Sequence, residues 1–492
     1  MDFERMLRSG AKVYFVGIKG TGMCALAELM HNSGTGISGS DRNEVFYTDE
    51  ILKELGIPYH ESFDAFHIRD ETDLVIHSAA YSIDSNPELR EAERRGIPIL
   101  KYTDALGAYS ALFDSSGIAG VHGKTTTTAM AGTLIRAVGL AARVLAGSAV
   151  GSFGGRSTLS LGDRFFVAET CEYRRHFLSF HPRRIVLTAV EPDHQDYFPT
   201  YRSIRDAFVE YCGLLPPGGE LIYCADDPGA CEVADIIRGS GTDLFFTPYG
   251  FGAEGDFRIL SYHVEGERAL MRLSAFPGDF RLRVPGRHEA LDAAAALALT
   301  SSLLKAQTGT EVRTGEHRDA LVKALEDFSG SKRRSEILGE AGGVLFMDDY
   351  AHHPTAIATT LAGLKDFYPH RRLLVSFMSH TYSRTAALLD GFASSFADAD
   401  VLILHKIYAS AREEYHGGVN GRTLFEKAES LRKETEKETY YFDEPAEAAE
   451  PLNAMLKKGD LFITLGAGDN WKLSGTLYKD RLKKQAAAGA RP

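Results

Sequence analysis

One short segment constrains this chain more than any other: a glycine-rich run followed by lysine and threonines, set between an apolar stretch and a helical pattern. The run is Gly120-Val121-His122-Gly123-Lys124-Thr125-Thr126. Glycines let backbone N–H groups wrap around phosphate oxygens, a lysine meets the β/γ-phosphate charge, and a hydroxyl holds Mg²⁺. The usual pattern has a glycine where this chain has Ile118. A turn with an incidental Gly-Lys-Thr is the alternative, but the context favours a nucleoside triphosphate site.

A second glycine-rich turn lies near the N-terminus, again between an apolar run and a helical pattern. Its residues are Gly17-Ile18-Lys19-Gly20-Thr21-Gly22, and the next apolar run ends at Ser40-Asp41. The spacing is G-x-x-G-x-G, whereas dinucleotide-binding folds carry G-x-G-x-x-G. A pyrophosphate at the helix N-terminus, with Asp41 or Ser40 near a ribose or sugar, fits this arrangement. The motif does not separate NAD from a nucleotide sugar, and a turn for close helix–strand packing is the alternative.

Acidic residues and a histidine follow two apolar runs in the middle of the chain. Glu169 closes the first run, and Glu191-Pro192-Asp193-His194 follows the second. Parallel strands bring their C-terminal ends to one edge of a sheet, which is also the edge that carries a phosphate loop. A carboxylate and an imidazole there are candidate Mg²⁺ ligands, although oxygen is the more usual donor. A helix-capping cluster is the alternative.

Polar groups also follow the apolar runs of the C-terminal third. The segments are Asp348-Asp349-Tyr350-Ala351-His352-His353-Pro354, His380-Thr381-Tyr382-Ser383-Arg384 and Gly466-Ala467-Gly468-Asp469. Acidic and imidazole groups on the first of these loops suit a substrate amine or a nucleotide ribose. Further ligands at a spacing suited to zinc are lacking. A surface turn is the remaining alternative.

Strand-length apolar runs alternate with helical patterns, which is typical of doubly wound parallel sheets. The alternation restarts twice, so the 492 residues divide into three α/β units. We predict a Rossmann-like N-terminal domain over 1–111, a central P-loop ATPase-like α/β domain over 112–331 and a Rossmann-like C-terminal domain over 332–492. From about 256 to 285 the pattern is strand-like without helices, which predicts an antiparallel extension of the central sheet.

Composition narrows the partners and the compartment. The formal net charge is −12 and no block of lysine and arginine offsets it, which argues against general binding to nucleic acid or anionic membranes. The five cysteines are scattered without a C-x-x-C pair, as in a reducing compartment. The charged N-terminus lacks the apolar core of a signal peptide. We therefore expect a cytoplasmic protein; the oligomeric state is not indicated.

Taken in order, these motifs resemble those of the Mur ligase family over essentially the whole chain. The set consists of eight segments: Gly17 to Met23, Gly120 to Thr127, Glu191 to His194, Pro285 to His288, Lys332 to Arg334, Asp348 to Pro354, His380 to Thr385 and Gly466 to Asp469. The Asp-Asp-Tyr-x-His-His-Pro and Gly-Ala-Gly-Asp elements are similar to the alanine-adding branch and to muropeptide ligases. The resemblance implies a three-domain ligase of peptidoglycan synthesis that joins L-alanine to the lactyl carboxylate of UDP-N-acetylmuramate, using ATP and Mg²⁺ through an acyl phosphate.

The resemblance also implies roles for individual residues. In the N-terminal domain, Gly17, Gly20, Thr21 and Gly22 would lie near the pyrophosphate of the UDP-sugar, with Asp41 and Ser78 near the uridine. In the central domain, residues 120–126 would bind ATP, and Lys124 among them would contact the β/γ-phosphates. Thr125 and Glu169 would hold one Mg²⁺, and His194 would hold a second. His122 would lie by the reacting carboxylate. In the C-terminal domain, His352 and Arg384 would contact the amino acid or the transferred phosphoryl group.

Three positions depart from the usual family pattern. Glu289 and Asp292 stand where two asparagines are usual, and Thr381 stands where an arginine is usual. The run after Glu169, Thr170-Cys171-Glu172-Tyr173-Arg174-Arg175, also differs from the usual acidic one. These differences leave open a related ligase with another amino-acid or peptide acceptor, and a nucleotide-sugar-binding protein without turnover. An NAD oxidoreductase is disfavoured because it leaves the phosphate loop without a role.

Overall fold

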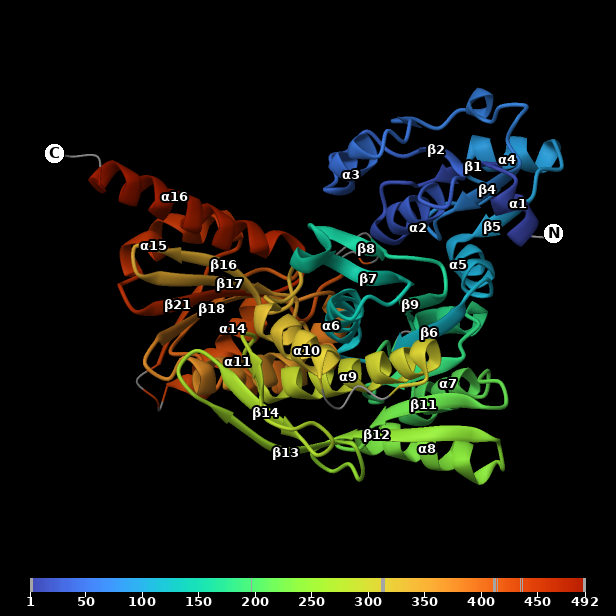
Figure 1. Cartoon of the computed structure of the whole chain (residues 1–492). Coiled ribbons are helices and arrows are strands. Elements are labelled where there is room, and N and C mark those ends of the chain that lie inside the picture. The colour runs from blue at the N-terminus through green and yellow to red at the C-terminus, as the bar shows by residue number, and fades with distance from the viewer. Residues whose placement is uncertain are drawn as a thin grey trace. The chain divides into compact units, whose positions relative to one another are not determined.

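The computed structural model describes residues 3–489 except 196, 311–314, 410–412, 414, 434 and 436 (Figure 1). Three sheets follow one another along the chain, each accompanied by helices, so the predicted α/β class is confirmed. The chain forms two compact units. The first consists of Met1–Ile259, Leu273–Pro277 and Leu291–Ala324, and the second of Leu260–Arg272, Gly278–Ala290 and Leu325–Pro492. The three domain boundaries given above remain predictions.

The N-terminal sheet has five parallel strands in the order β3-β2-β1-β4-β5. The central strand β1 is buried from Val13 to Val16, as expected of a strand covered on both faces. The strands are β1 (Lys12–Val16), β2 (Gly36–Ser40), β3 (Tyr59–His60), β4 (Leu74–His77) and β5 (Ile99–Lys101). The helices are α1 (Phe3–Arg8), α2 (Thr21–His31), α3 (Thr48–Glu54), η1 (Ala65–His67), α4 (Pro87–Arg94) and α5 (Tyr102–Ser110).

The central sheet has ten strands in the order β15-β14-β13-β12-β11-β10-β6-β9-β7-β8. Its strands are β6 (Asp114–Ala119), β7 (Ala142–Val150), β8 (Arg156–Ser160), β9 (Phe165–Glu169), β10 (Arg184–Leu187), β11 (Gly219–Cys224), β12 (Leu244–Gly250), β13 (Phe257–Val264), β14 (Ala269–Leu273) and β15 (Phe280–Leu282). Its helices are α6 (Lys124–Ala137), η2 (Gly151–Phe153), η3 (Tyr173–Ser179), α7 (Tyr201–Cys212), α8 (Pro228–Gly239), α9 (Arg287–Thr308) and α10 (Glu316–Asp327). The predicted strand-like region is β13–β15; β14 and β15 pair antiparallel, whereas β12 and β13 pair parallel over two residues.

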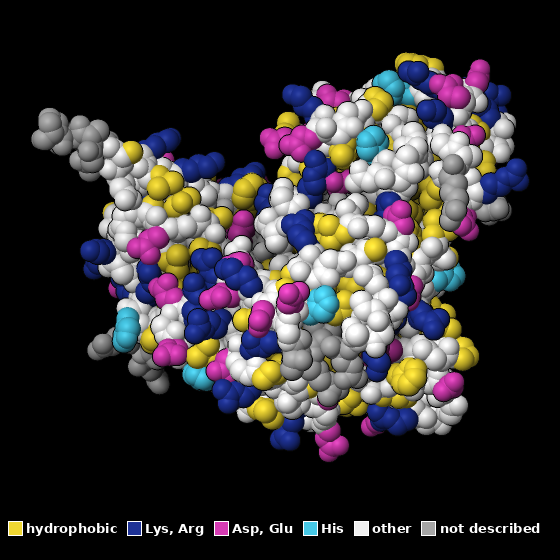
Figure 2. Space-filling model, viewed as in Figure 1, with side chains coloured by type: hydrophobic (Ala, Val, Ile, Leu, Met, Phe, Trp, Pro, Cys, Tyr) yellow, Lys and Arg dark blue, Asp and Glu magenta, His cyan; other side chains and the backbone are white. Residues whose placement is uncertain are grey.

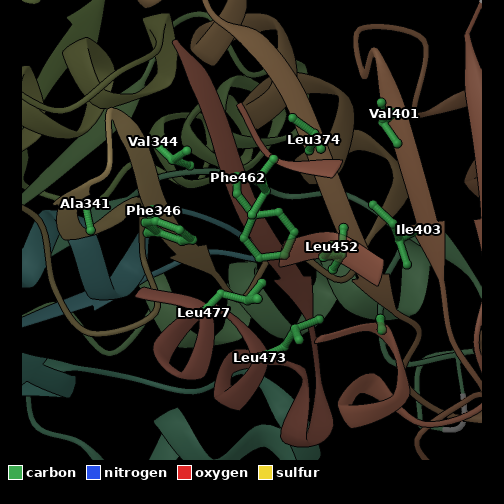
Figure 3. Close-up of a cluster of buried hydrophobic side chains, with 12 residues drawn as sticks. Ala341, Val344, Phe346, Leu374, Val401, Ile403, Leu452, Phe462, Leu473 and Leu477 are labelled. Atoms are coloured by element: carbon green, nitrogen blue, oxygen red, sulfur yellow. The ribbon is translucent and has the colours of Figure 1, made fainter. Parts of the chain in front are cut away.

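The C-terminal sheet has the order β16-β17-β21-β18-β19-β20 and is parallel except for β16. Phe346 and Phe462 of this sheet pack with Leu473 and Leu477 of α16 in a buried hydrophobic core (Figure 3). The strands are β16 (Glu336–Ala341), β17 (Val344–Asp349), β18 (Arg372–Met378), β19 (Val401–Leu404), β20 (Glu438–Tyr441) and β21 (Asp460–Gly466). The helices are α11 (Pro354–Phe367), α12 (Tyr382–Ala387), α13 (Leu389–Ser394), α14 (Gly421–Arg432), η5 (Pro445–Ala448), α15 (Ala449–Met455), η6 (Gly468–Asn470) and α16 (Trp471–Gly489).

The register of the central strands brings the candidate site residues to one edge of the sheet. Ile118 of β6 pairs with Glu169 of β9, and Ala119 pairs with Leu187 of β10. Because these strands are parallel, the segments that follow all three emerge at the same edge.

On the face shown in Figure 2, acidic and basic side chains are interspersed. No helix in the described part of the chain has the length and apolar character to cross a membrane.

Candidate active site

The phosphate-type loop has the backbone that its sequence predicts. Gly120 and Gly123 have φ values of +140° and +80°, which L side chains rarely adopt. A Cβ on Gly120 would lie 2.1 Å from Thr188 Oγ1, and one on Gly123 would lie 2.6 Å from Asp292 Oδ1. Gly123 precedes α6, and no side chain caps this helix. An uncapped helix N-terminus of this kind can bind an anionic ligand through its first N–H groups.

Lys124 begins α6 and its ammonium is turned toward the loop. Nζ donates hydrogen bonds to the carbonyl oxygen of Gly120 and, at 2.9 Å, to Glu172 Oε2. Burial alone would lower the pKa of Lys124, but the charge of Glu172, its hydrogen bond and the neighbouring acidic groups together outweigh burial and raise the pKa. Burial would likewise raise the pKa of Glu172, yet Lys124 and the hydrogen bond with His194 together hold it below its usual value. The pair is therefore charged at neutral pH.

The two carboxylates that follow β9 have separate partners. Thr125 Oγ1 donates to Glu169 Oε2 at 2.8 Å. Glu172 Oε1 lies 3.2 Å from His194 Nε2. Gly147 of β7 leaves room for Glu169, since a Cβ there would lie 2.3 Å from Glu169 Oε2. The structure thus gathers Lys124, Thr125, Glu169 and His194 at one edge, and Glu172 connects Lys124 with His194.

The sequence pattern assigned no role to Glu172, and it placed Glu191 only within an acidic segment of candidate Mg²⁺ ligands. Glu172 is 1% exposed although it follows the strand rather than belonging to it. Glu191 Oε1 lies against His122 Nε2. The signal for Glu172 was an acidic residue three positions after Glu169 within an otherwise irregular run. A sequence pattern does not reveal that such a residue turns inward to meet a lysine 48 positions away.

The N-terminal turn packs against side chains that follow β2 and β4. Gly17 has a φ of +87°, and a Cβ there would lie 2.8 Å from the Tyr81 ring and 3.0 Å from Ser78 Cβ. Asp41 is buried, and its Oδ2 accepts a hydrogen bond from the backbone N–H of Lys19 at 2.7 Å. Gly20 is the residue before α2, Thr21 and Gly22 begin that helix, and no side chain caps it. Asp41 therefore stabilises the turn, whose free N–H groups lie at the start of α2.

The C-terminal candidates lie together within the second unit. His352 Nδ1 is 2.9 Å from the carbonyl oxygen of Tyr350, and its ring centroid is 6.1 Å from that of His380. Arg384 of α12 places its guanidinium 3.4 Å from His380 Nδ1. Thr381 precedes α12 with a φ of +66°, which is strained for a β-branched residue. His352 and Arg384 thus share one neighbour, His380.

Two of the departing residues also have defined positions. Asp292 of α9 accepts a hydrogen bond from Thr127 Oγ1 at 2.8 Å and lies directly behind Gly123. Glu289 is 2% exposed and lies 3.7 Å from His288 Nε2. Asp292 therefore contacts the phosphate-type loop itself, so the replacement of an amide by a carboxylate falls at that loop.

Comparison with known proteins covers most of the chain. Residues 12–114 match the Mur ligase family catalytic domain, residues 118–300 the Mur ligase middle domain and residues 333–468 the Mur ligase, glutamate ligase domain. UDP-N-acetylmuramate–L-alanine ligase of Treponema pallidum strain Nichols is 54% identical over 470 residues, which is 96% of each chain. The protein of that name from Borreliella afzelii is 38% identical over 480 residues, covering 96% of this chain and 99% of the relative.

Solved structures show the same fold. The crystal structure of UDP-N-acetylmuramate-alanine ligase from Thermotoga maritima aligns with a TM-score of 0.73 at 24% identity, covering 96% of this chain and 99% of that one. A murein peptide ligase from Psychrobacter arcticus aligns with a TM-score of 0.64 at 21% identity, covering 96% and 98%. The three matching domains and the relatives above 30% identity establish that this chain belongs to the Mur ligase family.

Proposed function

We propose that this chain joins L-alanine to the carboxylate of UDP-N-acetylmuramate in peptidoglycan precursor synthesis, at the expense of ATP. The observation that carries the proposal is the 54% identity, over 96% of both chains, to a protein named for that reaction. The charged side chains at the edge of the central sheet (Lys124, Glu169 and Glu172) support this proposal, because phosphoryl transfer depends mainly on positioning and on cations near the phosphates. We propose the cytoplasm as its compartment, where ATP is supplied and where its free cysteines stay reduced.

The residues at this edge suit ATP and Mg²⁺. The uncapped start of α6 and the two positive-φ glycines form a cradle that side chains would fill. Hydroxyl and carboxylate oxygens of Thr125, Glu169 and Glu172 are the donors that Mg²⁺ prefers. We propose that Thr125 and Glu169 hold one Mg²⁺ and that Glu172 with His194 holds a second. Bound there, the metal would neutralise charge on the phosphate oxygens.

The reaction requires an activated carboxylate. An oxygen of the sugar carboxylate attacks the γ-phosphorus, ADP leaves, and an acyl phosphate results. The amine of L-alanine then attacks the acyl carbon, loses a proton, and inorganic phosphate leaves as the amide forms. In this scheme Lys124 leaves the Gly120 carbonyl to face the phosphates, while Glu172 keeps it charged. His122, oriented by Glu191, lies by the reacting carboxylate.

We propose the remaining roles as the family resemblance implies them. The turn of Gly17, Gly20, Thr21 and Gly22 binds the UDP-sugar pyrophosphate through backbone N–H groups. Asp41 and Ser78 lie toward the uridine. His352 and Arg384 contact the amino acid or the transferred phosphoryl group.

The test is phosphate release from ATP with UDP-N-acetylmuramate, Mg²⁺ and one acceptor at a time: L-alanine, glycine, L-serine or a muramyl tripeptide. We expect release with L-alanine well above the others. Greater release with the tripeptide or another amino acid would move the assignment to a neighbouring ligase. ATP binding without release for any acceptor would identify a nucleotide-sugar-binding protein without turnover.

A further inference from the structure

A small cavity lies between the N-terminal turn and the Glu169 carboxylate, inside the first unit. Its volume is about 190 Å³, enough for part of a sugar or a short acid side arm. Thr21 and Gly22 at the start of α2 line one side, and Gly147 and Glu169 of the central sheet line the other. Tyr102, the first residue of α5, lines the cavity between them.

The Tyr102 side chain lines this cavity and lies against the start of α2. A Cβ on Gly22 would lie 2.8 Å from the Tyr102 hydroxyl oxygen, so the phenol rests on the start of α2. Tyr102 lines the same cavity as Glu169, and a tyrosine hydroxyl is protonated at neutral pH. The hydroxyl forms no hydrogen bond with any residue that the structure describes. A neutral donor is thus exposed to the cavity.

The proposed substrate must cross this region. Its pyrophosphate would lie at the start of α2 and its carboxylate near Lys124 and Glu169, so the sugar and its lactyl arm lie between. A carboxylate beside Glu169 is repelled unless donors or cations surround it. A protonated phenol between the two sites is such a donor.

We propose that Tyr102 is a specificity-determining residue whose hydroxyl donates a hydrogen bond to the lactyl carboxylate of the sugar nucleotide. The proposal rests on the proposed function, because it presupposes UDP-N-acetylmuramate as substrate. His176 lines the same cavity, and its imidazole also has no hydrogen-bond partner in the described part of the chain. Burial, helped by Arg174, lowers the pKa of His176. A neutral imidazole has one N–H donor and one acceptor nitrogen, which suits a sugar hydroxyl.

The experiment compares two ligands that differ in the lactyl arm. Affinities for UDP-N-acetylmuramate and UDP-N-acetylglucosamine, which lacks that arm, are measured by calorimetry without ATP for the native chain and Tyr102→Phe. We expect the native chain to prefer UDP-N-acetylmuramate. The variant should lose about tenfold or more of that affinity, as expected for a hydrogen bond to a charged group. Its affinity for UDP-N-acetylglucosamine should stay within about twofold, because only the donor to the lactyl arm is gone.

Tyr201→Phe is the matched control. It removes a hydroxyl that donates to Glu232 on the surface of α7 and α8, away from the cavity, and should change neither affinity. A purely structural role for Tyr102 would weaken both ligands equally and would overturn the proposal, as would a native chain without preference between them. Failure to bind either nucleotide would instead refute the proposed function. Thermal melting checks that Tyr102→Phe remains folded.

Discussion

The chain contains two glycine-rich turns between a strand and a helix, and each carries a lysine with a different fate. Lys19 of the N-terminal turn has a fully buried side chain, with Nζ 2.8 Å from Glu61 and 3.1 Å from Asp49. Lys124 of the central loop is bound to Glu172 and to the carbonyl oxygen of Gly120. The first lysine is thus part of the architecture of its turn, and the second belongs to the proposed catalytic edge. Similar motifs therefore place their lysines in different surroundings, because the acids around them come from different parts of the fold.

The largest expected effect comes from Lys124→Ala. We expect turnover to fall by on the order of 10³-fold or more, since charge on the phosphates loses its main side-chain cation. Affinity for the UDP-sugar should stay within a few-fold. Phosphate release and calorimetry measure the two quantities. Lys479→Ala, an exposed lysine on α16, is the control and should be unchanged. Retained turnover in Lys124→Ala would remove the assigned role of this lysine.

Glu172→Gln tests the carboxylate partner of Lys124, which distinguishes the central loop from the N-terminal turn. The change removes the charge that holds Lys124 and contacts His194. We expect kcat to fall by roughly 10²-fold, the order seen when one preorganised electrostatic group is lost. Raising Mg²⁺ should restore part of the rate if Glu172 is a metal ligand. Glu210→Gln, which only breaks a surface pair with Arg175, should leave the rate unchanged. A normal rate in Glu172→Gln would show that Lys124 acts without it.

Lys19→Met should act on stability rather than on chemistry. Removing one partner of a buried pair costs about 3–5 kcal/mol. Asp49 and Glu61 are 21% and 51% exposed, so water compensates in part and we expect about 1–3 kcal/mol here. Chemical denaturation gives the free energy of unfolding, and phosphate release at saturating substrates should stay within about threefold. An unaltered stability with lost UDP-sugar binding would place Lys19 at the ligand and would erase the contrast with Lys124.

The smallest expected effect is the pH dependence of that stability difference. The backbone N–H of Phe46, Tyr59 and Lys19 together outweigh burial and hold the pKa of Asp49 below its usual 3.8. The ionised carboxylate of Asp49 therefore stabilises the folded state at pH values above 3.8. This stabilisation is lost as the pH falls through the lowered pKa of Asp49. The difference in melting temperature between the native chain and Lys19→Met should be largest near neutral pH and shrink below about pH 4. A difference independent of acid pH would show that Asp49 does not supply it.

The sequence determined the local geometry of both turns. The two glycine-rich runs predicted tight turns with close backbone approach, and in the structure Gly17, Gly120 and Gly123 have positive φ and no room for a Cβ. The alternation of strands and helices predicted an α/β chain, and strand ends predicted that Glu169 and the phosphate-type loop share an edge. These features follow from local sterics and from the direction of parallel strands, so a pattern reveals them.

The tertiary structure alone decided which charged groups meet. Glu172 turns inward to Lys124, Asp49 and Glu61 enclose Lys19, and Tyr102 spans from Gly22 toward Glu169. Each contact joins residues from different elements, and its formation depends on how those elements pack. A carboxylate or phenol has the same local sequence signature whether it faces water or a buried lysine. Burial and neighbouring charge, which set its pKa and its partner, arise only when the sheets and helices are assembled.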